Sequence, residues 1–395
     1  MEKMIYLDNA ATTYPKPDEV LDYMIEFYRE KGFNPGRSTY DLSVEVEDTV
    51  LNTRKKLMEF FNGDGDPDRL VFSYNASDSL NIIIQGILRK GDHVITTMLE
   101  HNSVLRPIYV LSQDRGIEVD YIPFDDKGYV DPDDFKTAIR PNTKLVIVNH
   151  SSNVIGTVQP IREIGEICRK RGVIFAIDAA QTAGVVPIDM EKDNIDIVAF
   201  TGHKSLYGPT GIGGLYSRRG IVIDPIRYGG TGVKSAVKTH LEEYPFRLEC
   251  GTLNIMGVAG LHAGLKYIEK EGIDNICQHE KSMIKKLIEG LRDIDGITMY
   301  FPDSLEHRCP VLSLNINGLS PADVGIILDV DYNIAVRTGL QCAPLVHEHM
   351  GTDPKGTVRF SAGYFTTEND IHSAIEIVKE IASQRSKENN RPLTS

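Results

Sequence analysis

The chain has 395 residues, of which 41% are hydrophobic and 25% are charged, so it is long enough for two globular domains. With 43 Lys and Arg against 56 Asp and Glu, its net charge of −13 opposes the binding of a nucleic-acid phosphate backbone. No stretch approaches the roughly 20 apolar residues that cross a bilayer, and the first residues lack the apolar segment of a secretory signal, so we expect no membrane association and a cytoplasmic location.

Short β-rich stretches alternate with helical patterns from about residue 69 to residue 217. The β-rich stretches are residues 69–73, 93–97, 144–150, 173–178, 195–200 and 213–217, and the helical patterns between them include 77–91 and 161–172. This alternation predicts a large three-layer α/β domain with a mainly parallel sheet, to which we assign residues 16–260.

The pattern changes after about residue 255. Amphipathic helical stretches at 257–272 and 281–294 lead into short strands and a closing helix at 369–384. We interpret this part as a smaller α+β domain that comprises residues 1–15 and 261–384. Residues 385–395 are polar and show no periodicity, so we expect a flexible tail there.

An acid and an amine follow two neighbouring strands of the large domain. Asp178 ends the strand at 173–178, and Lys204 comes shortly after the strand at 195–200. Ligands of open α/β sheets bind beyond the carboxyl ends of the strands. A pyridoxal-5′-phosphate (PLP) enzyme needs this pair, a lysine that attaches the cofactor and an acid that keeps its ring nitrogen protonated. Either residue alone is more simply a helix cap or a solvated side chain, but their combination favours the cofactor interpretation.

A second polar segment, residues 73–78, lies between a strand and a helix. Backbone N–H groups and the Ser77 hydroxyl at such a helix start can bind a phosphate, although Ser77 is also an ordinary helix cap. We expect Thr201 and His203 to approach the same phosphate from the neighbouring strand end.

Nine stretches together resemble the class V aminotransferase family, and within it the cysteine desulfurases and selenocysteine lyases. They are YLDNAATTYPKP, NPGRSTYDLS, EHNSVLRP, SNVIGT, IDAAQTAG, TGHKSLYGPTGIGG, RLECGTLN, VRTGLQCAP and GTVRFSAGYFTT. The resemblance implies the PLP fold-type I architecture, with a mainly parallel seven-stranded sheet. It also implies a homodimer with active sites at the subunit interface.

The resemblance also implies roles for individual residues. Lys204 corresponds to the Schiff-base lysine, Asp178 to the partner of the ring nitrogen, Gln181 to the donor to the ring hydroxyl, and His101 to the imidazole that stacks on the ring and assists proton transfer. Ala76, Ser77, Thr201 and His203 form the phosphate cradle, with Thr231 reaching the phosphate of the partner subunit. Arg359 is expected to bind the substrate carboxylate, Asn153 the carboxylate or the ring oxygen region, and Asn9 the substrate.

Cys342 stands where desulfurases carry the nucleophilic cysteine, and the compact segment around it resembles the group II enzymes. From the residues alone, a buried inert cysteine is the simpler interpretation. The resemblance implies removal of sulfur from L-cysteine to give L-alanine and a Cys342 persulfide, which passes to an acceptor protein or thiol. A lyase that acts on L-selenocysteine, another β-lyase, an aminotransferase and a non-catalytic sulfur-relay protein remain alternatives.

The chain departs from the family pattern at three places. Asn75 stands where the phosphate loop usually has Gly, although Asn tolerates a left-handed backbone. Leu340-Gln341 stand where many group II enzymes have two histidines, and Tyr40 replaces a frequent histidine. The pattern His347-Glu348-His349 lacks the spacing of a helical metal site, and the five scattered cysteines predict neither zinc nor a disulfide framework, so we expect no metal.

Overall fold

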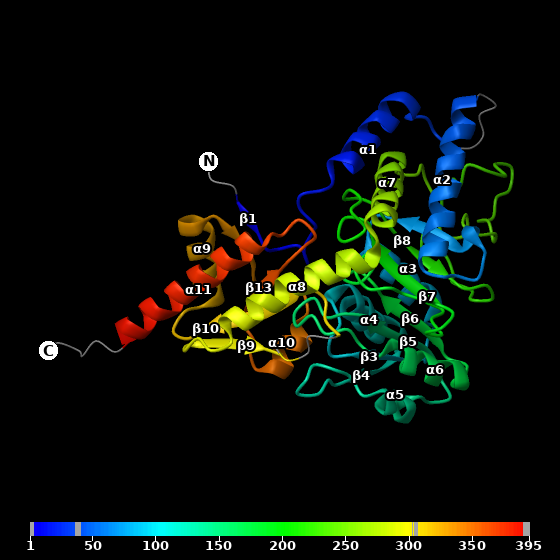
Figure 1. The fold of residues 1–395 in the computed structure, drawn as a ribbon. Coiled ribbons are helices and arrows are strands. Elements are labelled where there is room, and N and C mark those ends of the chain that lie inside the picture. The colour runs from blue at the N-terminus through cyan, green and yellow to red at the C-terminus, as the bar shows by residue number, and fades with distance from the viewer. Residues whose placement is uncertain (1–3, 36–40, 302, 304–306, 390–395) are drawn as a thin grey trace.

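The computed structural model describes residues 4–35, 41–301, 303 and 307–389. The described chain forms a large part built on a seven-stranded sheet and a smaller part, with helix α8 (Ile273–Leu291) running from one to the other (Figure 1). The predicted combination of a mainly parallel sheet with a smaller α+β part is confirmed. Within these residues no helix is long and apolar enough to span a bilayer.

The large sheet has the strand order β2-β8-β7-β6-β5-β3-β4. Its strands are β2 (Leu70–Ser73), β3 (His93–Thr97), β4 (Glu118–Ile122), β5 (Thr143–Asn149), β6 (Ile174–Asp178), β7 (Ile197–Thr201) and β8 (Gly213–Ser217). Strand β8 is antiparallel to its neighbours β2 and β7, whereas the other pairs are parallel. The carboxyl ends of β3 to β7 therefore lie along one edge of the sheet.

Helices cover both faces of this sheet. Alternate side chains of β6 belong to different hydrophobic clusters, with Phe175 and Ile177 on one face and Ala176 on the other. The first cluster includes side chains of α2, α6 and α7, and the second includes those of α3 and α4. The helices of the large part are α1 (Asp18–Lys31), α2 (Asp41–Phe60), α3 (Ala76–Ile87), α4 (Asn102–Arg115), α5 (Pro132–Ala138), α6 (Ile161–Arg171) and α7 (Ile255–Glu271), with a 3-10 turn η1 (Pro67–Arg69). Two covered faces are the reason that the strands are nearly continuous hydrophobic runs.

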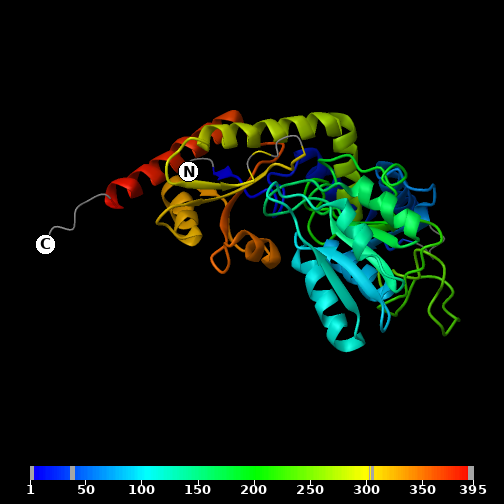
Figure 2. The same ribbon diagram turned by 90° about the horizontal axis from the view of Figure 1, so that it is seen from below.

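The smaller part contains a four-stranded antiparallel sheet of order β12-β13-β10-β9 and a short parallel pair, β1-β11. Its elements besides α8 are β1 (Ile5–Tyr6), β9 (Ile297–Tyr300), β10 (Val311–Ile316), α9 (Pro321–Tyr332), β11 (Ile334–Ala335), β12 (Arg337–Gly339), α10 (Pro344–Met350), β13 (Thr357–Ser361) and α11 (Glu368–Asn389). Figure 2 shows α8 and α11 along one side of this part, and both contribute to a second core with β10 and β13.

The two cores meet along α8. Ile276 belongs to the core of the large part and Met283 to that of the smaller part. The chain therefore passes from one core to the other between these two residues, whereas the sequence places the domain boundary after residue 260. That division remains a prediction. Helix α11 includes residues 385–389 of the expected tail, because Arg, Lys and Glu are good helix formers and no Gly or Pro interrupts them. Residues 390–395 and Tyr40 lie outside the described residues.

Candidate active site

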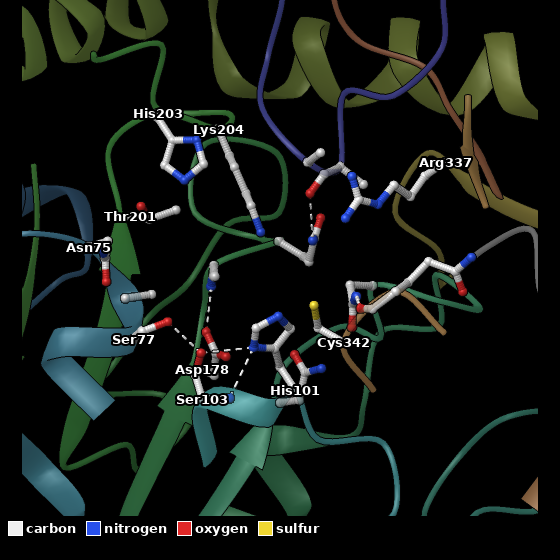
Figure 3. A pocket seen from close by; sticks show the side chains of 18 of the residues that line it. Asn75, Ser77, His101, Ser103, Asp178, Thr201, His203, Lys204, Arg337 and Cys342 are labelled. Carbon is white, nitrogen blue, oxygen red and sulfur yellow. Dashed lines mark hydrogen bonds between the residues drawn. The ribbon is translucent and has the colours of Figure 1, made fainter. Parts of the chain in front are cut away.

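A cavity of about 320 Å³ opens at the carboxyl edge of the parallel strands and is lined by both parts of the chain (Figure 3). It brings together eleven of the residues that the sequence singles out. They are Ala76, Ser77, His101, Asn153, Asp178, Gln181, Thr201, His203, Lys204, Cys342 and Arg359. Asn9 and Thr231 are not among its lining residues.

The acid and the amine lie at the same edge because β6 and β7 are parallel neighbours, with Asp178 opposite Ala199. Asp178 is 3% exposed, and its Oδ1 accepts a hydrogen bond of 2.9 Å from the Ala180 amide. Burial raises the pKa of Asp178, against the opposing effects of that amide and of Lys204. Burial also lowers the pKa of Lys204 to about 8, although Asp178 opposes the shift. An amine with this pKa is partly neutral near neutral pH, as a nucleophile must be.

The start of α3 has the features of an anion site. Asn75 caps the helix, because its Oδ1 accepts a hydrogen bond of 3.0 Å from the Asp78 amide. The φ of Asn75 is −175°, an extended backbone that any residue adopts, so this position does not need the left-handed conformation that Asn tolerates. Beside the helix start, Thr201 has a buried Oγ1 for which the described residues supply no hydrogen-bond partner. Backbone N–H groups at a helix start, beside a hydroxyl that no described residue uses, together suit a phosphate.

His203 ties the N-terminal segment to this edge. Its Nδ1 lies 3.1 Å from Thr12 Oγ1, and the Thr12 hydroxyl lies 3.0 Å from the His203 carbonyl oxygen. Because a carbonyl oxygen can only accept, the Thr12 hydrogen points to it and His203 Nδ1 donates. Burial lowers the pKa of His203 to about 4, so the ring is neutral near pH 7.

His101 is connected to the α3 start through Ser103, which sequence reasoning missed. The Ser103 amide donates to His101 Nδ1 at 3.1 Å, and the Ser103 and Ser77 hydroxyls lie 2.5 Å apart. Since Nδ1 accepts, the neutral imidazole carries its hydrogen on Nε2. Burial lowers the pKa of His101 to about 4, with Lys204 contributing in the same direction. The position of Ser103 in the first turn of α4, two residues after His101, was the available signal.

Three predicted residues have their side chains committed to other parts of the chain. Gln181 lines the cavity while its Nε2 donates to the Ala10 carbonyl at 3.0 Å. The Nδ2 of Asn9 donates to the Ser361 carbonyl at 3.1 Å, and its Oδ1 accepts from the backbone amide of Tyr14. The Asn9 side chain therefore fixes the N-terminal loop. Thr231 lies in a separate surface cavity, where its hydroxyl donates to the Val233 carbonyl at 3.2 Å.

Arg359 enters the cavity from β13 with part of its guanidinium in use. Its Nη2 lies 2.7 Å from Asp8 Oδ1, and its Nη1 donates to the Asn153 carbonyl at 3.0 Å. Its buried Nε has no partner among the described residues. Asp8, which the sequence reasoning did not single out, lies within the N-terminal stretch that carries the family resemblance. This ion pair fixes the orientation of Arg359.

Cys342 lies in the loop between β12 and α10, and Figure 3 shows its sulfur facing the cavity across from Thr201 and Ser77. It is exposed, so the alternative of a buried cysteine is wrong, whereas its reactivity remains a prediction. Gln341 and Cys342 have φ values of 43° and 60°. For residues other than Gly, this left-handed backbone costs roughly 1–2 kcal/mol each. Such strain is common at functional sites.

All five cysteines are described and free, and Cys168 and Cys309 are buried. Among the described residues no group of three or more His, Cys, Asp or Glu side chains is arranged to hold a metal ion.

Comparison with known proteins gives one consistent result. A family model described as "Aminotransferase class-V" matches residues 5–373. A Methanothermobacter thermautotrophicus protein named "Probable cysteine desulfurase" is 36% identical over 384 residues, which cover 96% of this chain and 94% of that protein. The apo structure of a cysteine desulfurase from Thermococcus onnurineus NA1 is similar, with a TM-score of 0.90, 35% identity, and coverage of 96% of this chain and 95% of that one. The Escherichia coli cysteine desulfurase CsdA, solved in an S-sulfonic acid form, has a TM-score of 0.85 at 27% identity and the same coverage.

Proposed function

The chain belongs to the class V aminotransferase family, and on that premise we propose that it is a PLP-dependent cysteine desulfurase, which converts L-cysteine into L-alanine and retains the sulfur on Cys342. One observation carries the proposal: the exposed thiol of Cys342 shares a cavity with Lys204 and Asp178. The names of the similar proteins support this activity.

The residues of the cavity fit the cofactor. The α3 start and the Thr201 hydroxyl, which has no partner among the described residues, would hold the phosphate. Lys204 would attach the cofactor covalently, and Asp178 would hold a proton on the ring nitrogen. Bound there, PLP supplies a ring that accepts electrons from the substrate α-carbon. The lowered pKa of Lys204 suits an amine that removes the proton from that carbon.

Arg359 and Asn153 orient the substrate. A carboxylate can reach the Arg359 guanidinium, which the ion pair with Asp8 holds in place. The Asn153 Nδ2 donates to the Gln341 carbonyl at 2.6 Å, which leaves its buried Oδ1 as an acceptor without a partner in the described chain. An acceptor suits a protonated group, so Asn153 fits the ring oxygen or an amine better than a carboxylate.

His101 stabilises the substrate sulfur. Its Nδ1 accepts from Ser103, so the neutral ring offers an Nε2–H donor. A donor in this position can hydrogen-bond to that sulfur and stabilise negative charge on it once it has become the outer sulfur of the Cys342 persulfide, without leaving a charged imidazole. The expected stacking of His101 on the cofactor ring and its assistance in proton transfer remain predictions.

Sulfur transfer then needs no external oxidant. A bond forms between Cys342 Sγ and the substrate sulfur, the substrate carbon–sulfur bond breaks, and its electron pair stays with the carbon skeleton. Protons convert that carbon into the methyl group of alanine. The sulfur is oxidised to a persulfide as the carbon is reduced, and the persulfide passes to an acceptor protein or thiol.

A substrate comparison tests the function. The PLP-loaded protein is incubated with L-cysteine or L-selenocysteine, and alanine, sulfide or selenide and the mass of the Cys342 peptide are measured. We expect alanine from cysteine and a gain of one sulfur on Cys342, both lost in Cys342→Ala. Cys277→Ala, on α8 away from the cavity, is the matched control. Cleavage that survives Cys342→Ala would instead favour a selenocysteine lyase, another β-lyase or an aminotransferase.

The same premise includes a homodimer in which Thr231 reaches the phosphate at the partner's site. Thr231 is not among the residues that line the cavity of its own chain, and it lies in a surface cavity of about 610 Å³. We expect a dimer by sedimentation and weaker PLP binding in Thr231→Ala. A monomer that binds PLP normally would contradict this part of the proposal.

A further inference from the structure

The loop that carries Cys342 is unusual because its backbone conformation is unfavourable and its anchor is a side chain. Gln341 and Cys342 occupy consecutive left-handed positions. Their carbonyl oxygens accept from Asn153 Nδ2 at 2.6 Å and from the Asn102 amide at 2.7 Å. These two bonds fix the carbonyl groups but not the side chain of Gln341, which is 6% exposed and turned into the protein.

The Gln341 amide is bound on both of its ends. Its Nε2 donates to the Thr357 carbonyl on β13 at 2.9 Å, and its Oε1 lies 2.9 Å from His347 Nε2. The Thr357 carbonyl oxygen can only accept, so the amide nitrogen must face it. The amide oxygen therefore faces His347, and His347 Nε2 carries the hydrogen.

His347 continues the chain of hydrogen bonds into α10. It is completely buried, and its Nδ1 lies 2.8 Å from Thr352 Oγ1, just beyond the end of the helix. With the hydrogen on Nε2, Nδ1 accepts from the Thr352 hydroxyl. Burial lowers the pKa of His347, which favours the neutral ring that this arrangement requires.

We propose that Gln341, His347 and Thr352 form a buried hydrogen-bond chain that positions Cys342, holding its thiol toward the cavity by fixing the left-handed backbone beside it. The inference rests on the proposed function for its consequence in catalysis. None of the three side chains needs to touch the substrate, so they are positioning residues. A displacement of about 1 Å at a reacting atom can reduce a rate by roughly 100-fold.

The test breaks this series of hydrogen bonds at two residues, one at a time, in the PLP-loaded protein. His347→Ala and Thr352→Val should lower kcat for alanine formation at least tenfold, with KM for cysteine and the visible absorbance of the cofactor unchanged. His347→Gln should restore much of kcat, because an amide can donate to Gln341 and accept from Thr352. His349→Ala is the matched control, since His349 is exposed on the same helix and contacts the Phe124 ring instead.

Hydrogen exchange supplies a readout that does not depend on activity. The Ala343 amide donates to the Leu340 carbonyl at 3.0 Å, and its exchange should accelerate at least tenfold in His347→Ala and Thr352→Val. Unchanged exchange and unchanged kcat in folded Thr352→Val would overturn the proposal, even if His347→Ala fails to fold. If the parent protein forms no alanine, the desulfurase assignment fails. The exchange rate of the Ala343 amide still decides whether these hydrogen bonds fix the loop.

Discussion

The cavity is built by two regions that place their reactive groups in different ways. At the sheet edge, Asp178 and Thr201 end neighbouring parallel strands, and Lys204 follows shortly after. Regular backbone pairing fixes these positions. Opposite them, Cys342 depends on a left-handed backbone and on individual hydrogen bonds. Substitutions at the sheet edge should therefore change the chemistry with little structural effect, whereas substitutions around Cys342 should also change the geometry of its loop.

The largest expected effect concerns the sheet edge. Lys204→Ala removes the amine that attaches the cofactor, so alanine formation and the visible absorbance of the attached cofactor should both disappear. The fold should persist, because Lys204 takes no part in the hydrophobic clusters. Absorbance and circular dichroism measure the two properties. A variant that still forms alanine at the parent rate would remove Lys204 from the mechanism.

The Thr201 hydroxyl tests the phosphate site more narrowly. A hydrogen bond to a charged group contributes about 1.5–3 kcal/mol, so Thr201→Val should weaken PLP binding roughly 10-fold or more. At saturating PLP, kcat should remain near that of the parent protein. PLP titration followed by fluorescence measures the affinity, with Thr137→Val on the exposed surface of α5 as the control. Equal affinities would place the phosphate elsewhere.

The sequence predicted the positions of the reactive residues better at the sheet edge than in the loop that carries Cys342. Parallel strands bring their carboxyl ends together by rule, so the sequence predicted that Asp178, Thr201 and Lys204 lie close together. Their proposed roles came from the combination of residue types and from the family resemblance. The hydrogen bond from Gln341 to Thr357 joins two elements through a tertiary contact, which no local pattern reports. The conformation of Asn75 was not predictable for a similar reason: its side chain caps α3 from an extended backbone, and the sequence alone does not distinguish that from a turn.

A buried carboxyl beside the sheet edge predicts a pH effect on stability. Glu100 Oε1 accepts from the Thr97 hydroxyl and the Asn149 amide, while its buried Oε2 has no partner within the described chain. Burial raises the pKa of Glu100 to about 8. Because this value lies above that of the unfolded chain, the stability contributed by the protonated group is present at low pH and is lost as the pH rises through 8.

Glu100→Gln imitates the protonated acid, so the variant should gain stability relative to the parent protein as the pH rises from 5 to 8. The slope is at most about 1.4 kcal/mol per pH unit. Urea unfolding at several pH values measures it, and Glu348→Gln on the surface of α10 controls for the lost charge. A stability difference that stays constant with pH would show that Glu100 is ionised in the folded protein.

The smallest expected effect compares the two regions directly, by the difference in stability between Gly and Ala at one position in each region. Glycine adopts a left-handed backbone without strain, so Cys342→Gly should be more stable than Cys342→Ala by about 1 kcal/mol. On β7 the order should reverse, with Ala199→Gly destabilising by about 1 kcal/mol or more because glycine loses more conformational freedom in a strand. Denaturant unfolding measures both differences. If Gly and Ala at position 342 are equally stable, the loop relaxes out of the left-handed conformation, and the strain attributed to Cys342 is absent in solution.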